Sequence, residues 1–166
     1  MPPRSSRPDI QAEIRVATPA DAPDIARVLR EAFAEFEPLY TERGFAATTP
    51  HEAVVRKRMN EGPAWVALFR NEIVGTVSAV IQHENSLYIR SMAIVPGARG
   101  HGTSKLLLRK VEETARQLKC RRLYLSTTPF LKSAIHVYES VGYGRVKEAH
   151  RDLFGTPIFT MEKTLK

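Results

Sequence analysis

The stretch IVPGARGHGTS at residues 94–104 decides the fold, because it ends an apolar strand and opens a helix with glycines at the corner. Gly100 and Gly102 lack the Cβ atoms that would keep a ligand away from the backbone, so the first N–H groups of the helix can point at an anion. The positive end of the helix dipole adds to that attraction. Arg99 places a permanent cation nearby, so the corner predicts a phosphate-binding loop.

The flanking residues support a strand, a loop and a helix in that order. Residues 86–95 are typical of a strand, and apolar residues recur at helical spacing as far as Cys120. A dinucleotide-binding fingerprint is not completed, because Lys105 stands where its third glycine belongs, and a Walker loop does not match either.

Two segments resemble the GCN5-related N-acetyltransferase (GNAT) family. Arg99, Gly102 and Ser104 follow the family's (Arg/Gln)-x-x-Gly-x-(Gly/Ala) pattern, with Ser104 adding a hydroxyl where Gly or Ala is usual. Residues 134–143, AIHVYESVGY, resemble the family's Ala-Ile-x-Leu-Tyr-Glu-x-x-Gly-Phe segment. Leu131 departs from the pattern, because the family usually has there an Asn that contacts the pantetheine arm of the cofactor.

The resemblance implies a fold and a cofactor. The fold is α/β (α+β): a mixed central sheet of about seven strands flanked by about four helices, in which two parallel strands splay apart at the cofactor site. The cofactor is acetyl-CoA, used as cosubstrate. Its pantetheine arm faces Met92, Ala93 and Ile94, with backbone hydrogen bonds from Met92 and Ile94. Its pyrophosphate is held by Arg99, Gly100, His101, Gly102, Thr103 and Ser104.

The resemblance also implies the reaction, in which a primary amine of a small molecule or protein attacks the thioester directly. Tyr138 protonates the departing thiolate. Several family members carry a Glu as base on the strand before the loop, where this chain has Tyr88. Tyr88, the nearby Glu84 and a water chain to backbone carbonyls remain open as the route for the amine proton. Tyr40, Phe45, Tyr88 and Phe154 are predicted to line the acceptor site.

Length and composition predict one domain. The chain has 166 residues, of which 43% are apolar, and we expect a flexible segment at residues 1–9 and a single N-acetyltransferase domain at residues 10–166. The single cysteine, Cys120, excludes an intrachain disulfide. No stretch has the apolar length of a membrane span or the pattern of a signal peptide, which predicts a cytoplasmic protein. The histidines lack metal-ligand spacing, so no metal is predicted.

Two alternative functions remain open when the net charge is considered. Lys and Arg number 25 against 18 Asp and Glu, giving a net charge of +7. Coenzyme A is itself a polyanion, so the excess does not require nucleic acid. A basic nucleic-acid-binding module ranks last, behind an acyl-CoA-binding regulatory domain without catalysis, which Leu131 and the missing strand Glu suggest. Monomer and homodimer both stay open.

Periodicity predicts the remaining elements. A half-exposed strand at residues 10–17 precedes a helix whose apolar face runs from Ile25 to Phe36. A loop holding Tyr40 and Phe45 leads to a second helix at about residues 50–60. Further strands are expected at residues 64–70, 73–81, 122–127, 143–149 and 158–165, and a last helix at residues 130–141. The strand at 122–127 must run parallel to that at 86–95, because a helix crosses between them.

Overall fold

The computed structural model describes residues 11–83 and 85–166, so the flexible segment predicted for residues 1–9 lies outside the described residues. An eight-stranded sheet has the order β1-β2-β3-β4-β5-β8-β6, with β7 paired to β8. Its strands are β1 (Glu13–Val16), β2 (Ala64–Phe69), β3 (Glu72–Gln82), β4 (Ser86–Ile94), β5 (Arg122–Thr127), β6 (Gly144–Arg145), β7 (Arg151–Leu153) and β8 (Thr156–Thr164). The helices are α1 (Ala22–Phe33), α2 (Glu42–Thr48), α3 (Glu52–Arg58), α4 (Thr103–Gln117) and α5 (Lys132–Ser140).

The sheet has the predicted mixed topology. Strands β1 to β4 form an antiparallel meander. The chain then crosses through α4, and β5 pairs with β4 in parallel, as the helical crossover requires. Strand β8 returns antiparallel to β5. The fold class is confirmed, with one strand and one α-helix more among the described residues than the sequence predicted.

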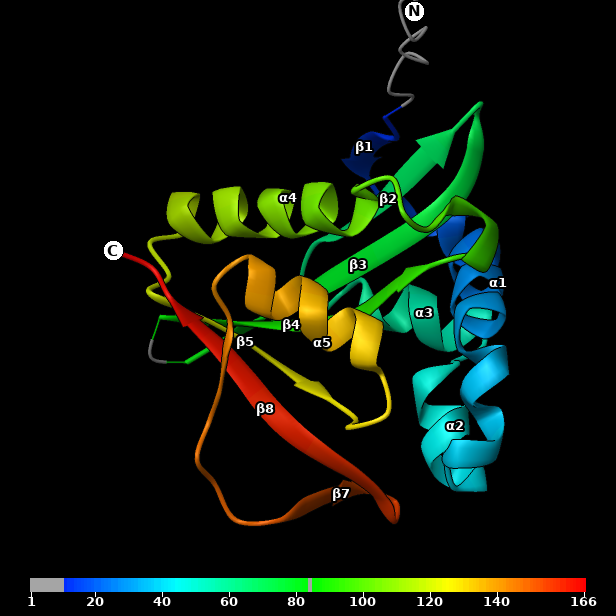
Figure 1. Cartoon of the computed structure of the whole chain (residues 1–166). Coiled ribbons are helices and arrows are strands. Elements are labelled where there is room, and N and C mark those ends of the chain that lie inside the picture. The colour runs from blue at the N-terminus through cyan, green and yellow to red at the C-terminus, as the bar shows by residue number, and fades with distance from the viewer. Residues whose placement is uncertain (1–10, 84) are drawn as a thin grey trace, which may run out of the picture.

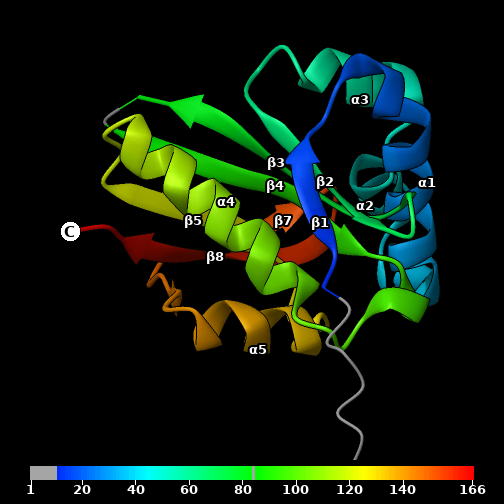
Figure 2. The same cartoon turned by 90° about the horizontal axis from the view of Figure 1, so that it is seen from above.

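Two apolar cores hold helices against opposite faces of the sheet (Figures 1 and 2). Helices α4 and α5 cover one face, where Leu107, Val111 and Tyr138 pack with Leu87 and Ile89 of β4 and with residues of β5 and β8. Helices α1 and α3 cover the other face over β2, β3 and β4. Neither β5 nor β8 contributes a residue to this second core, and α2 instead contacts Thr156 at the start of β8.

The loop predicted to hold Tyr40 and Phe45 is instead helical. After α1 the chain continues as a 3-10 helix at Ala34–Leu39 and then forms α2. The Thr41 hydroxyl caps α2 by accepting the Gly44 N–H at 3.0 Å, and the Thr41 N–H donates to the Thr156 hydroxyl of β8 at 2.9 Å. The sequence analysis missed α2 because this short helix depends on a capping residue and on a contact more than 100 residues away.

The C-terminal strand pair also differs from the prediction. Residues 143–149 were expected to pair with the last strand, but only Gly144 and Arg145 do so. Strand β7 pairs with the start of β8 through a two-residue turn in which Phe154 and Gly155 have φ of 50° and 94°. Positive φ at both central positions is the geometry of a tight hairpin turn. The single strand predicted to pair with β8 is therefore replaced by two short strands, β6 and β7.

A partly buried ion pair joins β1 to the start of α1. Arg15 donates two hydrogen bonds to Asp21, at 2.7 and 2.9 Å, and the Thr18 N–H donates a third at 2.8 Å. The hydrogen bonds from Arg15 and Thr18 outweigh the opposing effect of burial, so the pKa of Asp21 falls from 3.8 to about 2. The ionised carboxylate therefore stabilises the fold above about pH 4, and this stability is lost as the pH falls towards 2.

We predict that Asp21→Asn lowers the free energy of unfolding at pH 7 by about 1 kcal/mol, because it removes the charge that Arg15 and Thr18 hold. Urea denaturation at pH 7, 4 and 3 measures this, and the difference from wild type shrinks below pH 4. The control is Asp24→Asn, since the Asp24 side chain is 55% exposed. A difference that stays constant between pH 7 and pH 3 would contradict the assigned role of the charge.

Candidate functional site

The two parallel strands β4 and β5 separate partway along their length. Their pairing runs from Ser86 opposite Arg122 to Ile89 opposite Leu125, and no pair follows, although β4 continues to Ile94 and β5 to Thr127. The separation coincides with a bulge in the pairing of β4 with β3, where Ser91 has a φ of 57°. A bulge bends its strand, and here the bend leaves one edge of β4 without a strand partner.

Backbone alternation shows which groups line this gap. The Val95 N–H donates to the Val74 carbonyl of β3 at 2.9 Å. Because successive residues of a strand direct their backbone groups to opposite edges, Ala93 also faces β3, whereas Met92 and Ile94 face the gap. The alternation fits the roles that the resemblance implies for Met92 and Ile94. Ala93 does not fit, because its side chain packs in the core below α1.

The glycine corner follows β4 directly. Gly100 and Gly102 have φ of 83° and 74°, a region that favours glycine, and a Cβ atom added to either would meet no atom within 4 Å. Positive φ is therefore what requires glycine here, and the space in front of the loop is open. Of the remaining predicted loop residues, His101 is exposed, Thr103 buried and Ser104 half-buried.

The N-terminus of α4 presents unused donors at this corner. No side chain caps the helix, and its first turn carries no acidic residue. Within residues 11–83 and 85–166, no acceptor is found for the N–H groups of Thr103, Ser104 and Lys105. Three free N–H groups at the positive end of a helix of 15 residues fit a phosphate group.

The Arg99 side chain is held by acceptors on α1, on the segment that follows α1 and on β4. Its guanidinium donates to the Ala32 carbonyl of α1 at 2.9 Å and to the Ile94 carbonyl at 3.2 Å, and it forms an ion pair with Glu35. These acceptors hold the guanidinium against α1, away from the free N–H groups of α4. Arg99 thus fixes the corner between β4 and α4, and the positive field of the loop comes from its backbone.

Tyr138 lies on α5 with its ring buried, 6.0 Å from that of Tyr143. Burial, with smaller contributions from Tyr40 and Tyr88, raises the pKa of Tyr138 above its usual value of 10. The phenol therefore keeps its proton at neutral pH.

The predicted acceptor residues separate into three groups. Tyr40 packs against Phe45 and Phe130, with ring centroids 5.9 and 4.9 Å apart, while Tyr88 packs against Tyr124 at 5.0 Å. Phe154 instead lies on the β7–β8 turn, 51% exposed and stacked under Arg43. Glu84 lies outside the described residues. Leu131 occupies the N-cap of α5 and gives no side-chain cap.

The sequence analysis missed the polar groups beside Tyr88 and Tyr124. Arg151 donates to the Thr160 hydroxyl at 2.7 Å, and Glu148 accepts the Thr160 N–H at the same distance. Hydrogen bonds from Thr160 and the charge of Arg151 outweigh desolvation and lower the pKa of Glu148. Arg90 also lies on this side of the sheet. The alternation of residues along a strand predicts this position, because Arg90 follows Tyr88 by two residues.

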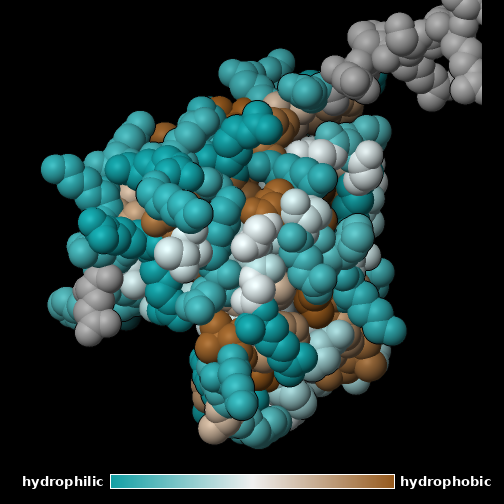
Figure 3. All heavy atoms as spheres, turned by 60° about the vertical axis from the view of Figure 1, so that its left-hand side comes forward, coloured by the Kyte–Doolittle hydropathy of each residue, from teal (hydrophilic) through white to brown (hydrophobic). Residues whose placement is uncertain are grey.

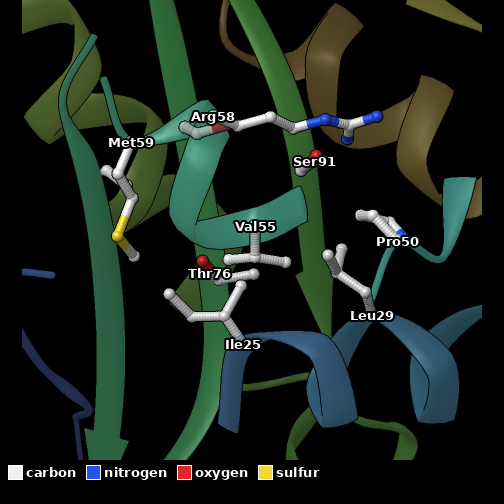
Figure 4. Close-up of a pocket in the computed structure, with 10 residues that line it drawn as sticks. Ile25, Leu29, Pro50, Val55, Arg58, Met59, Thr76 and Ser91 are labelled. Carbon is white, nitrogen blue, oxygen red and sulfur yellow. The ribbon is translucent and has the colours of Figure 1, made fainter. Parts of the chain in front are cut away.

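Two hollows lie on opposite faces of the sheet. A small cavity of about 20 Å³ lies between α1, α3 and the sheet, below the Arg58 side chain (Figure 4). It has room for about one water molecule and is too small for a substrate. A groove of about 470 Å³ runs along α4 and the end of α5, where Lys163 and Arg116 bind Glu112. On the side seen in Figure 3, hydrophobic residues form separate patches among hydrophilic ones.

Comparison with known proteins identifies the class. The sequence pattern of the Acetyltransferase (GNAT) family matches residues 25–143. The chain is 33% identical over 141 residues to the uncharacterized N-acetyltransferase YjgM of Escherichia coli, covering 82% of this chain and 84% of that protein. The chain therefore belongs to the GNAT family, and its enzyme class is N-acetyltransferase.

More distant relatives agree with the fold. The N-acetylaspartate synthetase of Danio rerio is 35% identical over 85 residues, which are 51% of this chain but only 30% of that protein. The PaiA N-acetyltransferase of Thermoplasma acidophilum in complex with coenzyme A superposes with a TM-score of 0.77 at 17% identity, over 93% of this chain and 99% of that one. The structure of YncA from Salmonella typhimurium with its cofactor acetyl-CoA has a TM-score of 0.75 at 16% identity, over 94% and 95%. In the part of the chain that the structure describes, no helix has the length and apolar character needed to cross a membrane.

We predict that Arg99→Gln lowers the free energy of unfolding by about 1–3 kcal/mol without any ligand, because it leaves buried carbonyls without their charged donor. Thermal or urea unfolding of the apo protein measures this. Arg109→Gln, on the exposed surface of α4, is the control and changes stability little. Unchanged apo stability together with weaker acetyl-CoA binding would instead support direct contact of Arg99 with the pyrophosphate.

Proposed function

We propose that residues 10–166 form a single domain that transfers an acetyl group from acetyl-CoA directly to a primary amine. One observation carries the proposal: the unpaired edge of β4 at Met92 and Ile94 leads into the free N–H groups at the start of α4. A ligand with an extended amide-containing arm and a pyrophosphate at one end matches both parts of that surface. Acetyl-CoA has this form.

The residues present fit the cofactor. The pyrophosphate would lie against the loop from Gly100 to Ser104, where glycines leave the backbone accessible and the first turn of α4 has unused N–H groups. Arg99 would contribute its backbone groups to the loop, and its side chain would keep the corner between β4 and α4 rigid. The amides of the pantetheine arm would pair with Met92 and Ile94 as an added strand does with a sheet edge. Bound in this way, acetyl-CoA supplies a thioester as the acetyl donor.

Tyr138 has the properties of the general acid. Its buried phenol stays protonated at neutral pH because burial raises its pKa. In the reaction the amine nitrogen bonds to the thioester carbonyl carbon, the carbon–sulfur bond breaks, and Tyr138 donates its proton to the leaving sulfur. A backbone N–H at the gap polarises the carbonyl oxygen. The proton lost by the amine passes to solvent. The candidate routes are Tyr88, which gives up its own phenolic proton as it receives one, Glu84, and a water chain held by backbone carbonyls.

The acceptor side consists of aromatic and polar groups on the face of the sheet away from α4. Tyr88 and Tyr124 stack there, and Tyr40 approaches from the segment between α1 and α2. The name of the Danio rerio relative states an N-acetylated amino acid as its product. That name favours a small-molecule acceptor over a protein acceptor for this chain as well.

We predict that acetyl-CoA at about 100 times its dissociation constant adds roughly 2.7 kcal/mol to the stability of the protein. Ser104→Glu abolishes this gain, because a carboxylate in the first turn of α4 repels the pyrophosphate while it favours the helix dipole in the apo protein. Lys110→Gln changes the net charge by the same amount on the exposed part of α4 and serves as control. Thermal unfolding with and without acetyl-CoA measures all three proteins, and an undiminished gain in Ser104→Glu would place the pyrophosphate elsewhere.

We predict that Tyr138→Phe lowers kcat for acetyl transfer by about 100-fold or more, the usual contribution of a general acid, and leaves the dissociation constant of acetyl-CoA within about twofold. Tyr143→Phe makes the same change in the neighbouring buried tyrosine and keeps most of the activity. Steady-state kinetics measure kcat, and calorimetric titration measures the dissociation constant of acetyl-CoA. Equal kcat values for wild type and Tyr138→Phe would remove Tyr138 from the mechanism.

A further inference from the structure

Two arginines lie together on the face of the sheet that carries Tyr88. Arg90 alternates on β4 with Leu87 and Ile89, which point into the core below α4 and α5, so Arg90 points to the opposite face. Arg58 is the last residue of α3, which covers that face next to β4. Arg58 lines a cavity together with Ser78 and Ser91, and Ser78 of β3 is paired with Arg90 of β4, so the two arginines lie in the same region of this face. Burial, and to a smaller extent the charge of Arg90, lowers the pKa of Arg58.

One carboxylate, that of Glu61, lies beside the two arginines and, among the described residues, pairs with Arg90 only. Arg90 Nη2 lies 3.1 Å from Glu61 Oε2, but its Nε is buried without any hydrogen-bond partner. Arg58 forms no ion pair within the described residues, and its single hydrogen bond to the protein is a long one, 3.4 Å, to the Ala47 carbonyl. Two positive charges therefore face one negative charge, and a buried donor that is left unpaired costs free energy unless a ligand binds it.

Two other arginines on this side of the sheet, Arg122 and Arg151, have partners of their own. Arg122 has its own carboxylate, with Nε 2.6 Å from Glu162 Oε2. Arg151 is held by Thr160 and lies 3.8 Å from Glu148. Only the pair of Arg58 and Arg90, among the arginines named on this face, keeps an uncompensated positive charge.

The pair borders the catalytic gap. Figure 4 shows the Arg58 side chain extended across the small cavity, with its guanidinium beyond Ser91, the bulge residue at which β4 leaves β5. Tyr88 influences the pKa of Arg58 and also that of Tyr138. Because Arg90 lies two residues after Tyr88 on β4, a group bound by the arginines lies on the Tyr88 side of the gap.

We propose that Arg58 and Arg90 bind a carboxylate of the acceptor, so that the enzyme acetylates an amine that also carries a carboxylate, as amino acids do. The proposal rests on the proposed acetyl transfer and adds its substrate class. A carboxylate matches the planar fork of a guanidinium with two parallel hydrogen bonds. It would supply the missing negative charge and accept from the unpaired Nε of Arg90.

Matched amines test the substrate class. Amino acids with a free carboxylate are compared with the same amino acids as carboxamides and with the corresponding decarboxylated amines, using acetyl-CoA as donor. We expect the carboxylate series to have a kcat/KM about tenfold or more above the other two, from hydrogen bonds to charged groups. Preferential acetylation of the carboxamides or decarboxylated amines would overturn the carboxylate site and leave acetyl transfer intact. Preference for an aminoalkyl phosphonate over its carboxylate counterpart would also overturn it.

Variants test the two residues. Arg58→Gln raises KM for the carboxylate substrate about tenfold or more, with a smaller effect on kcat and none on the dissociation constant of acetyl-CoA. Arg58→Lys keeps the charge and recovers part of the loss. Arg56→Gln is the control, because Arg56 lies on the same helix, is 46% exposed and pairs with Glu52. An equal KM in wild type and Arg58→Gln would overturn the assignment.

A binding measurement separates this proposal from the proposed function. Calorimetric titration of the acetyl-CoA-loaded protein with the same amino acids needs no turnover, and we expect binding that Arg58→Gln weakens about tenfold or more. Binding of the carboxylates without acetylation would support the arginine site and contradict the transferase function. No binding and no acetylation of any carboxylate substrate would overturn the arginine site, while stabilisation by acetyl-CoA would still report on the cofactor site.

Discussion

The separation of β4 from β5 after Ile89 is the constraint on which the rest of the molecule depends. A buried sheet edge destabilises a fold unless its backbone N–H and C=O groups find hydrogen-bond partners. Here the bulge at Ser91 bends β4 so that the backbone of Met92 and Ile94 faces a gap. The chain then turns through glycines into α4, whose first N–H groups are also free. The fold thus carries one continuous row of unused donors, which is costly unless a ligand binds there.

Other contacts keep this row in place. Arg99 ties the corner after β4 to the Ala32 carbonyl of α1, so the helix on one face of the sheet fixes the loop that serves the other face. Four of the five tyrosines of the chain pack in two pairs. Tyr138 packs on Tyr143, and Tyr88 packs on Tyr124. Their rings supply apolar surface and their hydroxyls proton donors, a combination suited to a reaction that must exclude most water yet move protons.

The sequence predicted the features that depend on residues close together in the chain. The glycine corner, the crossover helix and the parallel pairing of β4 with β5 follow from residues that are close in the chain, and the structure confirms the resulting fold class. Contacts distant in sequence explain what the sequence did not reveal. Helix α2 depends on the contact of Thr41 with Thr156, and the hydrogen bond from Arg99 to the Ala32 carbonyl joins residues that are 67 positions apart. Arg58 was missed for the same reason, because neither α3 nor β4 alone reveals that its partner is Arg90.

Hydrogen exchange at individual backbone amides of β4, followed by NMR with and without acetyl-CoA, tests the central claim most directly. The account predicts fast exchange at Met92 and Ile94 in the apo protein, slow exchange at Ala93, which faces β3, and marked protection of Met92 and Ile94 when acetyl-CoA is added. Slow exchange at all three amides in the apo protein would show that the edge is already paired. Exchange at Met92 and Ile94 that acetyl-CoA leaves unchanged would contradict the gap as the binding site.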